Sequence, residues 1–151
     1  MNAFARARAF AAYEHAVDTI PPLRQIVLLY DAAMRRVREA RRAIEEGRIE
    51  DRFHAVARAT AIVDALHKCL DFEKGGEIAT ILDLYYTDLA LRLQDINIRN
   101  EVGACDEVLA RLADMRAAWA QLAGEHDDSE EHRRESPVTP SAPSRALGVP
   151  G

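Results

Sequence analysis

Proline is confined to the two ends of this chain, and this limits the fold more than any other feature. The six prolines occupy positions 21, 22, 137, 140, 143 and 150. Proline breaks a helix interior because it lacks a backbone N–H and its ring clashes with the preceding turn. The proline-free stretch between them is rich in Ala, Leu, Arg and Glu, which form helices well, and has no alternating strand pattern. We therefore predict an all-α fold.

Apolar spacing divides this stretch into four helices. We expect the first from Pro22 to Gly47, the second from about Glu50 to a turn at 74–76, the third over 77–99 and the fourth over 101–123. Short connections between long helices favour an antiparallel four-helix bundle over residues 19–124. The predicted core positions are Ile26, Leu29, Ala33, Val37, Ala40 and Ile44; Phe53, Val56, Ala59, Val63, Leu66 and Leu70; Ile78, Leu82, Tyr85, Leu89, Leu93 and Ile96; and Val102, Cys105, Leu109, Leu112, Met115, Trp119 and Leu122.

Two segments flank the predicted bundle. Residues 1–18 carry apolar side chains at helical spacing and are predicted to form a short amphipathic cap segment. Residues 125–151 are acidic and then rich in Pro and Ser, a composition typical of disorder.

Several classes of protein are disfavoured by what the sequence lacks. The longest apolar run, residues 26–30, is too short to span a membrane, and no secretory signal pattern follows the first residue. A net charge of −5 argues against a nucleic-acid-binding protein. The two cysteines, Cys69 and Cys105, are expected to be buried free thiols of a reducing cytoplasm, and a disulfide between them is the less favoured alternative.

No motif for catalysis or cofactor binding is present. The chain has no phosphate-binding glycine loop and no zinc spacing of Cys and His. Asp-x-x-His occurs twice, at residues 51–54 and 64–67, but both copies fall on one predicted helix, whereas a di-metal bundle site needs ligands from facing helices. All serines lie in the predicted tail. We therefore expect no cofactor, no metal and no enzymatic activity.

Two surface features have open interpretations. Arg35, Arg38 and Arg42 form a predicted exposed stripe, which either binds an acidic partner or nucleic acid, or is a solvated face balanced by Glu39, Glu45 and Glu46; we favour the second. The third helix carries an additional apolar stripe, Ile81, Leu84, Leu91 and Ile98. This stripe either packs on a second neighbouring helix or lines a groove for a partner helix.

The order of several motifs resembles the flagellar secretion chaperone FliS family. The segment 17–22, Val-Asp-Thr-Ile-Pro-Pro, followed by 26–31, Ile-Val-Leu-Leu-Tyr-Asp, is similar to the opening of that family. The segment 70–79, Leu-Asp-Phe-Glu-Lys-Gly-Gly-Glu-Ile-Ala, is similar to its connection between helices two and three. Smaller matches include Asn97 and Ala118-Trp119, so the resemblance covers about residues 10–123.

The resemblance implies an antiparallel helical bundle that acts as a cytoplasmic export chaperone. Such a protein binds the C-terminal segment of flagellin, prevents premature polymerisation and aids delivery to the flagellar type III export gate. A regulatory adaptor that sequesters an anti-sigma factor or another flagellar regulator is the alternative function. A metal-dependent bundle enzyme is a third, least favoured hypothesis.

Apolar positions that the core does not all require are the candidates for binding the partner. We expect this surface to include Phe10, Tyr13, Leu28, Tyr30, Ile62, Ile81, Leu84 and Leu91, with ordinary core packing as the alternative for each. Residues of the family motifs, namely Asp31, Gly75, Gly76, Glu77, Asn97 and Trp119, are expected to brace helix ends, form the turn or pack in the bundle.

Overall fold

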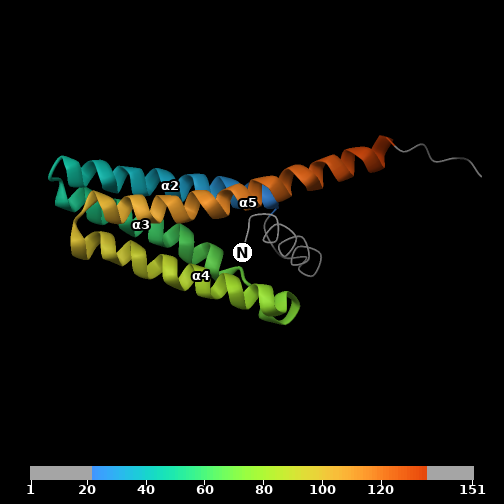
Figure 1. Cartoon of the computed structure of the whole chain (residues 1–151), viewed down its shortest axis with the longest axis horizontal. Helices are drawn as coiled ribbons and strands as arrows, with labels where there is room; N and C mark the ends of the chain where they lie inside the picture. Colours follow the sequence, from blue (N-terminus) through green and yellow to red (C-terminus); the bar gives the residue numbers. More distant parts are fainter. Residues whose placement is uncertain (1–21, 136–151) are drawn as a thin grey trace, which may run out of the picture.

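The chain folds as a bundle of long helices, as the sequence predicts. A computed structural model describes residues 22–135, which form α2 (Leu23–Glu45), α3 (Ile49–Lys68), α4 (Phe72–Arg99) and α5 (Val102–Glu135) (Figure 1). The predicted cap residues Phe10 and Tyr13 lie outside the described residues. Consecutive helices run antiparallel because each connection spans only a few residues.

The packing partners of each helix fix the layout of the bundle. Helix α2 packs on α3 and α5, and α4 packs on the same two helices. Within residues 22–135 the backbones of α2 and α4 do not approach each other, nor do those of α3 and α5, so each of these pairs lies diagonally across the bundle. The outer faces of α2 and α4 therefore point to opposite sides of the molecule.

The core consists mainly of the predicted apolar stripes. Val37, Val63, Leu93 and Leu112 are all at most 2% exposed, one from each helix. Phe53 is a correction, because it is 56% exposed rather than buried. Phe53 fits the apolar spacing of the helix, but its side chain lies at the edge of the core. The smaller side chains of Val56 and Ala59, further along α3, are the ones that are buried. Cys105 is buried as expected, whereas Cys69 is exposed, and both are free thiols.

The break between α3 and α4 lies earlier than predicted. Helix α3 ends at Lys68, and α4 begins at Phe72, so Lys74 and Gly75 belong to its first turn. The Asp71 side chain accepts a hydrogen bond from the Lys74 N–H at 3.0 Å, which caps the new helix. Gly76 then kinks α4 with φ +51° and ψ −126°, a conformation that favours glycine.

The last helix continues beyond its predicted end near Ala123. Helix α5 extends to Glu135, so the expectation of disorder from residue 125 is wrong for residues 125–135. This segment contains no proline, and its polar side chains bond locally: the Ser129 hydroxyl donates to the Glu125 carbonyl at 2.8 Å. Asp127 also accepts hydrogen bonds from Arg24 at the start of α2. Local bonding and one tertiary ion pair are thus present where composition alone predicts a disordered chain.

Candidate partner-binding surface

The outer face of α4 carries an apolar stripe that the described bundle does not cover. Ile81, Leu84, Leu91 and Ile98 are 44%, 66%, 66% and 78% exposed. On the opposite side of the same helix, Leu82, Leu89 and Leu93 are buried in the core. Within residues 22–135, the second apolar stripe predicted from the sequence is therefore exposed and does not pack on a second neighbouring helix. We call these four exposed residues the α4 stripe.

The dimensions of the α4 stripe suit a partner helix. Its members recur at intervals of three and seven residues, so they follow one line along the helix surface. From Ile81 to Ile98 the stripe runs about 25 Å, at a rise of about 1.5 Å per residue. An amphipathic helix binds such a line with apolar side chains at the same intervals.

Polar contacts on both flanks hold α4 in position. Toward α5, Asp88 accepts a hydrogen bond from Arg111 at 2.5 Å, and within α4 it accepts one from Arg92 at 3.0 Å. The Tyr85 hydroxyl donates to the Arg111 carbonyl at 3.2 Å. The bond to Arg111 directs the Asp88 carboxylate, which lies between Leu84 and Leu91 in the sequence, toward α5. The α4 stripe is thereby presented by a braced helix.

Toward α3, a second pair of contacts braces α4. His67 Nε2 lies 2.5 Å from the Asp83 carboxylate, and the His67 ring packs against the Tyr86 ring with centroids 5.7 Å apart. The Tyr30 and Tyr86 hydroxyls lie 3.1 Å apart and link α2 to α4 within the core. Burial, with the neighbouring Tyr86 as a smaller cause, raises the pKa of Tyr30 well above its ordinary value, so the Tyr30 phenol is a neutral hydrogen-bonding group here.

The predicted partner-binding residues divide into four groups. Ile81, Leu84 and Leu91 share the α4 stripe, and Leu28 is 64% exposed on α2. Ile62 is half-buried against the core. Tyr30 is a correction, because it is fully buried and hydrogen-bonded and so presents no surface to a partner. Phe10 and Tyr13 lie outside the described residues.

The surroundings of the family-motif residues agree only partly with the roles expected from the sequence. Asp31 binds Arg116 of α5 through two hydrogen bonds of 2.5 and 3.2 Å, in mid-helix and not at a helix end. These bonds lower the pKa of Asp31 below its ordinary value. Trp119 is buried in the core, while Glu77 is exposed. Asn97 is half-buried, and its Oδ1 has no hydrogen-bond partner among residues 22–135.

Sequence reasoning missed other exposed apolar side chains. Ile49 and Phe53 in the first turns of α3 are 62% and 56% exposed, and Phe72 at the start of α4 is 54% exposed. Ile49 and Phe72 are the first residues of their helices, where the apolar spacing does not indicate which side of the helix they occupy. Ile98 was placed in the second stripe but was not among the expected binding residues. Its exposure of 78% makes it the most exposed member of the α4 stripe.

Sequence comparison provides the family of this bundle. The family model described as "Flagellar protein FliS" matches residues 5–126, which include almost all of the described bundle. This chain belongs to the FliS family. Its relatives are named as chaperones and not as enzymes.

Relatives from three bacteria share about a third of their residues with this FliS-family chain. The flagellar secretion chaperone FliS of Salmonella typhimurium is 36% identical over 119 residues, which cover 78% of this chain and 88% of the relative. The flagellar secretion chaperone FliSB of Pseudomonas aeruginosa is 34% identical over 106 residues, covering 70% and 84%. The flagellar secretion chaperone FliS of Campylobacter jejuni is 35% identical over 101 residues, covering 67% and 79%.

Two further findings bear on the function of this family member. None of the helices in the described part of the chain is long and apolar enough to cross a membrane. Over residues 22–135, no three or more His, Cys, Asp or Glu side chains are grouped so that they could hold a metal ion. The α4 stripe is an exposed apolar surface of the kind that binds partner proteins.

Proposed function

We propose that this chain is a cytoplasmic export chaperone that binds the C-terminal segment of flagellin. In this function it prevents premature flagellin polymerisation and aids delivery to the flagellar type III export apparatus. The observation that supports the proposal is the α4 stripe, an exposed apolar line on a member of a secretion chaperone family. Large exposed apolar side chains in a row are typical of a binding surface.

The physical chemistry of the stripe fits a client that folds as it binds. An amphipathic segment without a partner exposes its apolar side chains and is prone to associate with other copies. Laid on the α4 stripe as a helix, the segment buries those side chains together with Leu84 and Leu91. The ordering of the segment costs conformational entropy, which lowers the affinity gained for each unit of buried area.

The test is a calorimetric titration of the full chain with the C-terminal segment of flagellin from the same organism. We expect saturable binding near one to one, a negative heat-capacity change, and more helix by circular dichroism than the two parts have separately. Leu91→Glu should abolish or greatly weaken binding, because it places a charge in the middle of the stripe. Ala113→Glu, at an exposed position on α5, adds the same charge elsewhere and serves as the matched control.

Two results would contradict this proposal. One is the absence of heat and of added helix at tens of micromolar, which would favour the regulatory adaptor instead. The other is equal binding by Leu91→Glu and the unmodified chain, which would place the flagellin site elsewhere on the bundle.

A further inference from the structure

The arginine stripe of α2 is not balanced by the glutamates beside it in the sequence. Glu39 pairs with Arg36 at 3.0 Å, and Glu45 pairs with Arg41 at 2.5 Å. Glu46 accepts from Arg48, in the turn before α3, at 2.7 Å. All three glutamates that could neutralise the stripe therefore bind other arginines.

Four exposed arginines of α2 and α3 are left without a carboxylate partner. Within residues 22–135, no ion pair is formed by Arg35, Arg38 or Arg42 on α2, or by Arg58 on α3. We call these four residues the arginine surface. The positive charges of Arg35 and Arg38 also help to lower the pKa of Asp31, but the Asp31 carboxylate is already bonded to Arg116. The arginine surface thus carries positive charge on a chain whose net charge is −5.

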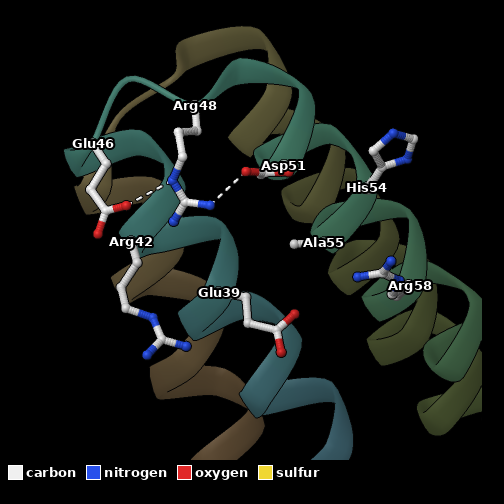
Figure 2. A pocket seen from close by; sticks show the side chains of 8 residues that line it. All are labelled: Glu39, Arg42, Glu46, Arg48, Asp51, His54, Ala55 and Arg58. Atoms are coloured by element: carbon white, nitrogen blue, oxygen red, sulfur yellow. Dashed lines mark hydrogen bonds and ion pairs between the residues drawn. The ribbon is translucent and has the colours of Figure 1, made fainter.

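Two hollows adjoin the arginine surface, and its arginines line them. The first, of about 410 Å³, lies between α2 and α3, with Arg42 contributed by one helix and Arg58 by the other (Figure 2). Figure 2 also shows Arg48 bonded to Glu46 and Asp51, which closes the upper rim of this hollow. The second hollow, of about 570 Å³, lies toward α5 and is lined by residues that include Arg35, Arg38 and Leu109.

We propose that the arginine surface docks an acidic helical segment of a partner protein. A guanidinium presents a planar fork of N–H donors that matches a carboxylate, so arginine is suited to binding acidic side chains. Arg35, Arg38 and Arg42 recur at intervals of three and four residues, the same intervals that place glutamates on one face of a partner helix. Arg58 meets such a helix from across the first hollow.

Charge favours an acidic protein segment over nucleic acid. Three acids, Glu39, Glu46 and Asp51, also line the first hollow. They repel the continuous charge of a phosphate backbone, whereas a peptide places its carboxylates at separate positions and can avoid them.

This docking surface is distinct from the proposed flagellin surface. The arginine surface is on the outer side of α2 and the adjoining edge of α3, and the α4 stripe is on the opposite side of the bundle. Both surfaces can therefore be occupied at the same time. The proposal does not require that flagellin binds to the α4 stripe.

The test measures binding of a defined acidic peptide to the full chain. The probe is a fluorescein-labelled alanine-based peptide with glutamate at alternating intervals of three and four residues, followed by fluorescence anisotropy at low salt. We expect saturable binding that weakens as salt is added, since salt screens exposed charges. The double variant Arg42→Glu with Arg58→Glu should lower the affinity by about fivefold or more, as expected for the loss of several exposed charge pairs.

The matched control changes net charge by the same amount elsewhere. Arg133→Glu with Arg134→Glu alters two exposed arginines at the end of α5 and should keep the affinity within about twofold of the unmodified chain. Leu91→Glu should also leave peptide binding within about twofold, which separates this surface from the flagellin site. Circular dichroism of each variant checks that the bundle is folded.

Several results would overturn the proposal. Absence of saturable binding, or an equal loss in both double variants, would show that no specific acidic site exists. Tighter binding of single-stranded DNA, lost in the Arg42 and Arg58 variant, would make this a nucleic-acid surface. Self-association of the chain in sedimentation experiments that the same variant abolishes would identify a second copy as the occupant instead.

Discussion

Leu91 and Leu93 lie two residues apart on α4 and point in nearly opposite directions, so they form a matched pair for testing the bundle. Leu91 is 66% exposed on the α4 stripe, whereas Leu93 is fully buried in the core. The same substitution, leucine to alanine, has the same intrinsic effect on helix propensity at both positions. Any difference in stability therefore reports on packing.

The structure gives the size of the expected difference. Leu93→Ala removes a side chain from the centre of the core and leaves a cavity, which should lower the free energy of unfolding by about 3 kcal/mol, within the usual range of about 2–5 kcal/mol. Leu91→Ala removes a side chain that is mostly in water and should change the free energy of unfolding by less than about 0.5 kcal/mol.

Urea denaturation followed by circular dichroism at the helix band measures both variants. With a slope of about 2 kcal/mol per molar urea, Leu93→Ala should lower the midpoint by about 1.5 M, while Leu91→Ala should leave it nearly unchanged. Titration with flagellin should show the opposite order, with weaker binding for Leu91→Ala than for the unmodified chain.

An equal destabilisation by the two substitutions would refute this reasoning. It would mean that Leu91 is packed in solution, either against a second copy of the chain or against a segment outside residues 22–135. Repeating the Leu91→Ala measurement at several protein concentrations separates these explanations, because only self-association depends on concentration.

Three further predictions concern single features of the bundle. Asp31→Asn should lower the free energy of unfolding by at most about 1 kcal/mol, since Asp31 and Arg116 are both over a third exposed. Because the pKa of Asp31 is lowered in the folded state, the stability difference between the variant and the unmodified chain should be present at neutral pH. Urea titrations should show that this difference shrinks below about pH 4. Gly76→Ala should cost about 1–2 kcal/mol, since φ of +51° strains a residue with a Cβ, and thermal melts should detect it. Cys69 should react rapidly with a thiol reagent in the native protein, whereas burial raises the pKa of Cys105 to about 11 and should block its reaction until urea unfolds the chain; rapid reaction of both thiols would contradict this.

The sequence was informative about the helices because their cause is local. The absence of proline over most of the chain and the recurring three- and four-residue spacing predicted an all-α bundle, and the structure confirms it. The same spacing revealed a second apolar stripe on α4, which led to Ile81, Leu84 and Leu91 as candidate binding residues. Periodicity alone left open whether another helix covers that stripe.

The errors of sequence reasoning have a common physical origin. Tyr30 and Leu28 lie two residues apart in one apolar run, and only the positions of α4 and α5 decide that Tyr30 is buried and Leu28 exposed. Phe53 has an apolar side chain at a core spacing, yet it falls outside the contact with neighbouring helices. The spacing of apolar residues predicts which side of a helix faces the core, but not how much of that side the neighbouring helices cover.

Sequence by itself determined the helical class, the approximate helix lengths and the family resemblance, because these depend on local propensity and on motif order. Only the tertiary structure decided which apolar residues stay exposed and which arginines remain unpaired. Arg41 is an example, because besides its local partner Glu45 it binds Asp106 of α5 at 2.9 Å, a pair that forms only when α2 and α5 pack together. Binding at the surface depends on the side chains that remain exposed or unpaired, and these are fixed only when all the helices have packed together.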